Sequence, residues 1–236
     1  MKDKIIKWVF GESSVQFKDD WVKKQLLSLD KGSKILDAGA GELRWKQYCQ
    51  HLQYISQDFG EYGGGGSVGL QSDTWDASRN DIISDIVDIP VENNVFDAVL
   101  CTEVLEHIPC PEKAINEFSR IIKSNGVLLI TAPFCSLVHM APYYYCSGFS
   151  LFWYEYHLEK YGFEIEEIEQ NGDFFLFLRQ ELHRTSYMCE RYGRPIGMLK
   201  KLNLIYMAHW LGKESKEKND SGETLCFGYC VKARKR

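Results

Sequence analysis

The chain has 236 residues, of which 44% are hydrophobic and 26% charged, and its formal net charge is −5. A chain of this length can bury a full core in one domain, or in one domain with an insertion. It has no apolar run near the ~20 residues that span a bilayer and no secretory core at its start, so we expect a cytoplasmic location. Its eight cysteines form no Cys-x-x-Cys pair, which argues against a zinc site and a disulfide framework.

The charge is unevenly distributed along the chain. Residues 1–170 carry 15 basic and 26 acidic side chains, whereas residues 171–236 carry 13 basic and 7 acidic ones. The net-acidic first part disfavours a nucleic-acid partner. The basic second part either attracts an anionic substrate, a phospholipid surface or a lipid-linked sugar, or is only a solvated helical face with a frayed end.

The first informative segment is residues 35–41, Ile-Leu-Asp-Ala-Gly-Ala-Gly. It predicts a buried strand that ends at Asp37 and runs into a turn at Gly39 and Gly41, where a side chain would collide with a ligand. A carboxylate in front of the glycines would repel a pyrophosphate, so a cofactor with a cationic amino-acid end fits better. S-adenosylmethionine (SAM) meets that demand.

Further strands follow in chain order. Residues 54–59 form a second strand, with Asp58 about 20 residues beyond Asp37, where doubly wound folds place the acid that holds ribose hydroxyls. The glycine-rich residues 60–80 predict a surface loop in place of a helix, either a plain linker or a lid ordered by ligand. We expect more strands and a helix in an alternation that predicts a parallel sheet: strands at 81–89, 95–101 and 126–132, and a helix from Pro111 to Asn125.

With these motifs in order, residues 32–163 resemble the class I SAM-dependent methyltransferases, although Leu43 stands where the family's third glycine often lies. The resemblance implies an α/β fold, with a Rossmann-like, seven-stranded, mostly parallel sheet whose last strand is antiparallel. By resemblance, Asp58 binds the ribose and Asp85 with Ile86 the adenine. The full cofactor-binding set is Asp37, Gly39, Gly41, Asp58, Asp85, Ile86 and Glu103.

Glu103, Glu106 and His107 form a second constellation, at positions i, i+3 and i+4. On one helical turn they would share a face and present two oxygens and one nitrogen to Mg²⁺ or another divalent cation. The pattern resembles the metal-binding element of ubiquinone-pathway O-methyltransferases and small-RNA 2′-O-methyltransferases, and His139 would complete such a site. A very similar sequence motif occurs in methyltransferases that bind no metal, where these side chains pack or form hydrogen bonds. A metal site and a structural role therefore both stay open.

The aromatic run 134–163 follows the fifth predicted strand, at the edge where open α/β sheets bind ligands. Its tyrosines suit a sugar ring or an aromatic acceptor, because tyrosine offers a flat apolar face and a hydroxyl. Methyl transfer to a hydroxyl needs a base, and histidine is the natural one near neutral pH. We therefore predict His139 as the base, with His107 and Tyr143 as further catalytic candidates; plain packing is the alternative for His139, Tyr143 and Tyr144.

The end of the chain predicts a final strand pair and an insertion. Residues 162–168 alternate as a strand, their partner is 224–232, and 173–218 between them form helices whose apolar stripes we expect to cover their own body. A dimer face, giving a homodimer, or a membrane-surface element is the alternative. We expect a core at 1–170, a helical insertion at 171–223, and the last strand with a basic tail at 224–236.

The amino-acid sequence from His139 to Leu158 also resembles that of uncharacterised methyltransferases of bacterial surface-polysaccharide biosynthesis. The first expectation for function is therefore O-methylation of a sugar or glycan precursor by a histidine base. The alternatives are O-methylation of a quinone or phenol with divalent-metal help, a non-catalytic SAM-binding module, and an NAD-dependent enzyme.

Overall fold

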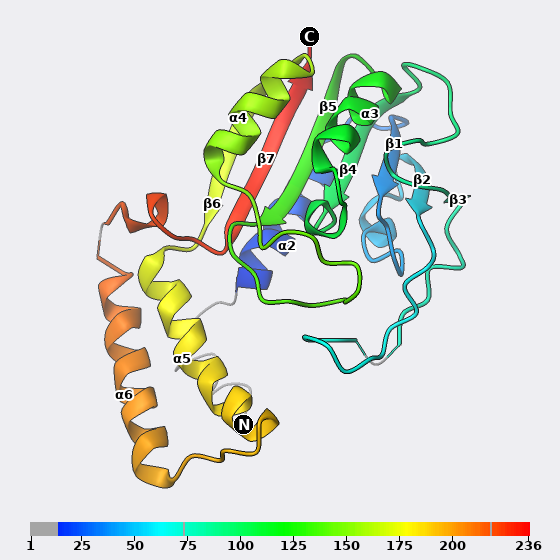
Figure 1. Ribbon diagram of the computed structural model, residues 1–236. Coiled ribbons are helices and arrows are strands. Elements are labelled where there is room, and N and C mark those ends of the chain that lie inside the picture. Colours follow the sequence, from blue (N-terminus) through cyan, green and yellow to red (C-terminus); the bar gives the residue numbers. More distant parts are fainter. Residues whose placement is uncertain (1–13, 73, 218) are drawn as a thin grey trace. The chain divides into compact units, whose positions relative to one another are not determined.

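A seven-stranded sheet forms the centre of the structure, a computed structural model that describes residues 14–72, 74–217 and 219–236 (Figure 1). The strand order is β3-β2-β1-β4-β5-β7-β6. The pairs β1–β2, β1–β4, β2–β3 and β4–β5 are parallel, whereas β7 runs antiparallel to β5. This confirms the predicted Rossmann-like α/β fold with an antiparallel last strand.

The elements have the following bounds. The strands are β1 (Lys34–Ala38), β2 (Gln53–Asp58), β3 (Ile82–Ile83), β4 (Phe96–Thr102), β5 (Ile122–Pro133), β6 (Phe163–Asn171) and β7 (Gly228–Lys235). The α-helices are α2 (Ser14–Leu27), α3 (Pro111–Ile121), α4 (Leu151–Lys160), α5 (Phe174–Arg191) and α6 (Met198–Glu214). Three short 3₁₀ helices are η1 (Lys46–Tyr48), η2 (Leu105–His107) and η3 (Ser221–Glu223).

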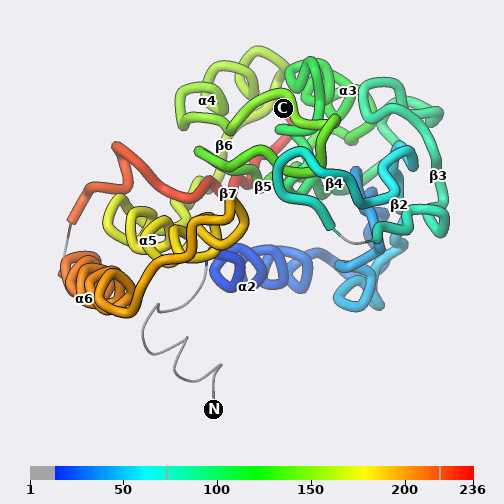
Figure 2. Tube along the Cα trace, turned by 60° about the horizontal axis from the view of Figure 1, so that its bottom comes forward, coloured from blue at the N-terminus to red at the C-terminus, as the bar shows by residue number. Residues whose placement is uncertain are grey.

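Helices cover both faces of the sheet (Figure 2), with α2 on one side and α3 and α4 on the other. Pro111 at the first turn of α3 fits a position where the backbone N–H has no helical partner, and Ile115 and Phe118 are fully buried. Sequence reasoning missed α2, although its buried side chains Trp21, Val22 and Leu26 recur at helical spacing and pack into the same core cluster as β1 and β4.

Several predictions differ from the observed elements. The helix predicted from Pro111 to Asn125 ends at Ile121, and the strand predicted at 126–132 already begins at Ile122. The strand predicted at 81–89 has only two residues, because the chain turns directly afterwards: Asp85 accepts a hydrogen bond from the Val87 amide (3.1 Å). The strand predicted at 224–232 begins at Gly228 instead, since residues 221–223 form η3. Side-chain capping and local turns of this kind compete with a short strand pattern.

The described part of the chain divides into two compact units, residues 19–169 with 228–236, and residues 14–18 with 170–227. The first holds the sheet. In the second, α5 and α6 form a hairpin whose ends are tied at Asp173, which caps α5 through the Leu176 amide (2.8 Å) and accepts a hydrogen bond from Ser215 (2.6 Å). Gly212 lets α6 approach α5, because a Cβ there would lie 2.7 Å from the buried Arg179 guanidinium.

The expectation that the apolar stripes of this insertion cover their own body is wrong for α6. Four of the stripe residues are exposed by 44% to 70%: Leu202, Ile205, Tyr206 and Trp210. Each helix of a two-helix hairpin buries one side against its partner, which leaves the other side of α6 open. In the described part of the chain, no helix is long and apolar enough to cross a membrane.

Candidate functional site

The glycine turn after β1 adopts the left-handed backbone that favours glycine, with φ of +75° at Gly39 and +50° at Gly41. A Cβ at Gly39 would lie 2.4 Å from a methyl group of Val104, and a Cβ at Gly41 would lie 2.4 Å from the ring of Trp75. We expected a side chain here to collide with a ligand; in the structure it collides with the protein's own Val104 and Trp75. Trp75, which covers Gly41, gave no recognisable signal in the sequence.

Asp58 holds this turn from the end of β2. One carboxylate oxygen accepts a hydrogen bond from the Gly41 amide and the other from the Gly60 amide, both at 2.9 Å. Each oxygen keeps a further lone pair, since a carboxylate has about four acceptor positions. The predicted ribose-binding acid is therefore also the side chain that fixes the glycine turn to the loop that follows β2.

Gln57 is a residue of this edge that sequence reasoning missed. Its side chain is fully buried, accepts a hydrogen bond from the Gly39 amide (3.3 Å) and donates one to the Ser84 carbonyl (2.7 Å). The ends of β1, β2 and β3 are thus joined by one amide side chain. The only signal in the sequence was its position directly before Asp58.

Asp37 is a buried carboxyl of this edge with a strongly raised pKa. It is fully buried at the end of β1, where the Tyr54 hydroxyl donates a 2.6 Å hydrogen bond to Oδ2. Oδ1 has no hydrogen-bond partner among the described residues. Burial raises the pKa of Asp37 from 3.8 to about 7; the Tyr54 hydrogen bond opposes this shift and the charge of Asp58 adds to it. Asp37 is a carboxyl that a cation would stabilise.

The other predicted cofactor residues lie along the same edge. Asp85 is exposed and Ile86, beside it, is buried in the turn after β3. Glu103 follows β4 in a left-handed conformation (φ +55°), and its carboxylate accepts a hydrogen bond from the Thr131 hydroxyl (2.9 Å). Because parallel strands present their carboxyl ends at one edge, β1 to β4 bring all of these residues to the same side of the sheet.

Glu106, His107 and His139 form a cluster of possible ligand atoms that all lie within 4.8 Å of one another. Glu106 Oε1 is 3.8 Å from His107 Nε2 and 3.9 Å from His139 Nε2, and the Glu106 side chain is almost completely buried. The predicted sharing of one helical turn by Glu103, Glu106 and His107 is wrong, because η2 begins only at Leu105 and Glu103 points to Thr131. His139, from the loop after β5, takes that third place.

The hydrogen bonds of the two histidines fix which nitrogens face the cluster. His107 Nδ1 bonds to the Tyr143 carbonyl (2.5 Å) and His139 Nδ1 to the Leu137 carbonyl (2.8 Å). A carbonyl only accepts, so both Nδ1 atoms carry hydrogen and both Nε2 atoms face Glu106. Burial lowers the pKa of His107 to about 4, so that its Nε2 holds a lone pair at neutral pH. Lone pairs and a carboxylate oxygen that face one point favour a cation or proton between them.

The loop that holds His139 is attached to the glycine-rich loop 60–80. The Leu70 amide donates to the Val138 carbonyl (2.9 Å), and the Met140 amide donates to the Leu70 carbonyl (3.0 Å). The described residues of 60–80, which leave out residue 73, contain no helix, as predicted. The loop after β5, where we predicted the acceptor, is thus hydrogen-bonded to the loop after β2, where we predicted part of the cofactor site (Figure 1).

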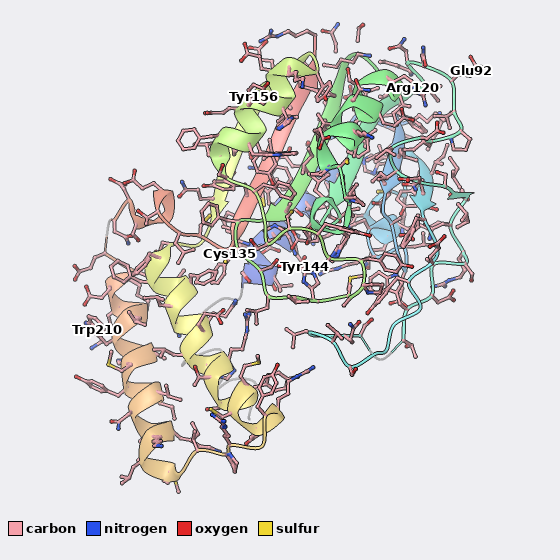
Figure 3. All side chains as sticks on the ribbon, in the orientation of Figure 1. Glu92, Arg120, Cys135, Tyr144, Tyr156 and Trp210 are labelled. Atoms are coloured by element: carbon pink, nitrogen blue, oxygen red, sulfur yellow. The ribbon has the colours of Figure 1, made fainter. Side chains whose placement is uncertain are left out.

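Two of the three consecutive tyrosines line this junction. The Tyr143 ring packs edge-on against Phe59, with centroids 4.8 Å apart, and its hydroxyl donates to Glu61 (3.3 Å). The Tyr144 ring lies 5.2 Å from the His139 ring, on the loop that Figure 3 marks at Tyr144 and Cys135. Tyr145 is half exposed. Of the predicted catalytic candidates, the His107 and His139 side chains meet, whereas Tyr143 contacts His107 through its backbone carbonyl and directs its side chain to Phe59 and Glu61.

Comparison with known sequences finds similarity to methyltransferases in part of the chain. Residues 69–130, from the glycine-rich loop into β5, match the family model described as a methyltransferase domain. A tRNA (carboxymethyluridine(34)-5-O)-methyltransferase of Arabidopsis thaliana is 31% identical over 109 residues, which cover 45% of this chain and 25% of that protein. The chain spans a quarter or less of the length of the curated relatives that it matches.

Comparison with solved structures finds the same fold over nearly the whole chain. A SAM-dependent methyltransferase from Archaeoglobus fulgidus superposes with a TM-score of 0.56 at 14% identity, covering 98% of both chains. The [4+2]-cyclase SpnF superposes with a TM-score of 0.55 at 17% identity, covering 95% of this chain and 83% of that one. Because a cyclase shares the fold, the fold by itself does not determine the reaction.

Proposed function

We propose that this chain is a SAM-dependent methyltransferase. Two findings support the proposal: part of the sequence matches a methyltransferase domain, and the fold is shared with a methyltransferase of known structure. The observation that carries the proposal is the buried Asp37, whose Oδ1 has no partner among the described residues and whose pKa is raised to about 7. An uncompensated carboxyl of this kind fits the ammonium group of an amino-acid cofactor better than it fits a pyrophosphate. SAM also supplies, when bound, a methyl group on a sulfonium that a nucleophile can attack.

The side chains of this edge divide the cofactor between them. Asp37 would bind the ammonium group, and Asp58 would use its remaining lone pairs for the ribose hydroxyls. Asp85 and Ile86 would hold the adenine. These roles rest on the position of each residue at the carboxyl edge of the sheet and on the resemblance of the motifs. Methyl transfer then depends mainly on holding the acceptor about 3–3.5 Å from the methyl carbon.

The proposed acceptor is a hydroxyl of a sugar or glycan precursor. His139 Nε2 would accept its proton, because His139 Nδ1 already carries hydrogen toward the Leu137 carbonyl. The Tyr144 ring lies beside His139, and the Tyr143 ring packs against Phe59 on the neighbouring loop; both rings suit a sugar face. His107, which is neutral at pH 7 because burial lowers its pKa to about 4, is the second candidate for the base.

A second candidate function is O-methylation of a quinone or phenol with the help of a divalent cation. The donor set fits such an ion: a buried carboxylate and two imidazole Nε2 atoms converge, and both rings are oriented by Nδ1 hydrogen bonds to carbonyls. Glu106, His107 and His139 would hold the ion. Bound there, it would lower the pKa of an acceptor hydroxyl, and His139 would then be a ligand instead of a base.

The cofactor proposal is tested by calorimetric titration with S-adenosylhomocysteine. We expect saturable binding that Asp58→Asn weakens by at least tenfold, because the substitution removes one charged acceptor while keeping the size of the side chain. Asp30→Asn, an exposed carboxylate in the turn before β1, is the matched control. Absence of binding by the unaltered chain, with and without added metal, would overturn the proposal and favour NAD or a role without cofactor. Binding without turnover on sugars, quinones and phenols would favour the non-catalytic SAM-binding module.

A titration of the protein with Mn²⁺, followed by the electron paramagnetic resonance of the ion, distinguishes the role of His139 as a base from its role as a metal ligand. If the cluster holds an ion, His107→Ala and His139→Ala each abolish binding, while His183→Ala, an exposed histidine of α5, leaves it unchanged. If His139 acts as a base without metal, Mn²⁺ does not bind, and His139→Ala lowers kcat by about 10²–10⁴ with little change in KM. Full turnover by His139→Ala at neutral pH would contradict both roles.

A further inference from the structure

Helix α6 keeps a stripe of large apolar side chains in solvent. Met198, Leu202, Tyr206 and Trp210 recur at every fourth position and therefore follow one side of the helix. They are 75%, 54%, 70% and 44% exposed, and Leu199 beside them is 78% exposed. Figure 3 marks Trp210 on this helix. An isolated exposed leucine is ordinary, but five such side chains in four turns of helix form a continuous apolar surface.

The stripe contributes none of the buried residues of α6. The buried residues of α6 are Ala208, Leu211 and Gly212, and Gly212 is the point where the helix meets Arg179 of α5. None of the stripe residues is buried. Folding of the hairpin therefore does not explain why the exposed side of α6 is apolar.

The charge around the stripe is mostly basic, with Glu190 and Glu214 as acidic residues at its two ends. From residue 191 to residue 213 the sequence contains five basic residues and no acidic one. Lys200 and Lys201 lie in the first turn of α6, next to Met198 and Leu199, and both are exposed. The Lys201 ammonium has one acidic neighbour, an exposed Glu190 carboxylate at 3.8 Å. The stripe and its basic border form the α6 face, defined by Met198, Leu199, Leu202, Tyr206 and Trp210 with Lys200 and Lys201.

We propose that the α6 face binds the surface of an anionic phospholipid membrane. Leucine and methionine side chains enter the boundary of the acyl chains, tryptophan and tyrosine lie at the head groups, and lysines pair with anionic lipid. A second copy of the chain fits less well, because a twofold interface would bring the same basic border against itself. The inference goes beyond the proposed methyl transfer and does not depend on it.

Vesicle flotation of the full chain tests the proposal. We expect the protein to float with phosphatidylcholine vesicles that contain about one-third phosphatidylglycerol, to bind pure phosphatidylcholine weakly, and to dissociate from the anionic vesicles at high salt. Because each basic residue at such a surface strengthens binding about fivefold, Lys200→Gln with Lys201→Gln should weaken partitioning roughly 25-fold. Leu202→Ser with Tyr206→Ser should abolish it.

Phe152→Ser provides the matched control, since Phe152 is 74% exposed on α4, outside the hairpin. It should leave flotation unchanged. A thermal melt of each variant identifies loss of folding, and the lysine pair, which is exposed, keeps the test valid if the apolar pair unfolds. The proposal is overturned if the unaltered chain does not float with anionic vesicles, or if the folded α6 variants float as well as it does. A concentration-dependent dimer that the α6 substitutions dissociate, without any flotation, would assign the face to a second copy.

Discussion

The sheet unit and the α5–α6 hairpin differ in how far they bury their apolar side chains. In the sheet, Leu100 and Ile130 are completely buried between layers of helices, whereas on α6 Leu199 and Leu202 are more than half exposed. A sheet has two faces and both are covered here, so nearly every apolar residue of its central strands finds a partner. A helix in a hairpin has one partner, so burial on one side leaves the other side free for binding.

The polar side chains of the two regions also differ, because those of the sheet edge are held by hydrogen bonds and those of α6 are exposed. At the carboxyl edge of the sheet, Asp58, Gln57 and Glu103 are each held by hydrogen bonds to another strand or loop. The lysines of α6 lie in solvent. Positions that have to be fixed to a fraction of an ångström are therefore built into the sheet, and a surface that needs only area and charge lies on the hairpin.

The largest predicted effect of this contrast is a pH dependence that comes from Asp37. Its pKa in the folded state is about 7, above the 3.8 of the exposed group, so the folded state holds the proton more tightly. The stabilisation is complete below pH 4 and is lost as pH rises through 7, which costs on the order of 4 kcal/mol. We expect the free energy of unfolding of Asp37→Asn, measured in urea without cofactor, to rise relative to the unaltered chain between pH 4 and 8. A constant difference over that range would contradict the burial of an uncompensated carboxyl.

A matched pair of leucine truncations compares the two regions directly. Leu100→Ala removes a completely buried side chain and should lower the free energy of unfolding by about 2–5 kcal/mol, because it leaves a cavity in β4. Leu202→Ala removes one that is 54% exposed and should change it by less than about 0.5 kcal/mol. Denaturant titration measures both. Similar losses for the two variants would mean that the α6 stripe is packed in solution.

The smallest predicted effect concerns two glycines with positive φ. Gly41→Ala places a Cβ against the Trp75 ring, whereas Gly65 has the same backbone sign (φ +75°) and nothing within 4 Å. Both substitutions lower the free energy of unfolding by about 1 kcal/mol, because alanine is strained in the left-handed backbone. Gly41→Ala must in addition displace Trp75. We expect a stability loss roughly 1–2 kcal/mol greater at Gly41, together with weaker S-adenosylhomocysteine binding. Equal losses at the two positions would show that Trp75 moves away freely.

Local patterns predicted most of the sheet. The segments at 35–37, 54–59, 95–101 and 126–132 carry strand-forming residues, mostly apolar, and end in or near a carboxylate or a turn, so their strand character and order could be inferred without any tertiary information. The two-residue β3 could not be inferred, because capping of the Val87 amide by Asp85 ends that strand early. The α2 helix was missed although its buried residues recur at helical spacing.

The candidate site was only partly predictable. The sequence determined that Asp37, the two glycines and Asp58 follow successive strands, and strand order then places them on one edge. The sequence also offered His139, from a loop more than thirty residues away, as a further ligand beside Glu106. Tertiary structure alone decided that Glu103 leaves this set, because the left-handed Glu103 directs its carboxylate to Thr131. It also decided that Trp75 covers Gly41 and that the α6 stripe stays exposed. Periodicity reports which residues share a side of an element, but what lies against that side depends on chain segments distant in sequence.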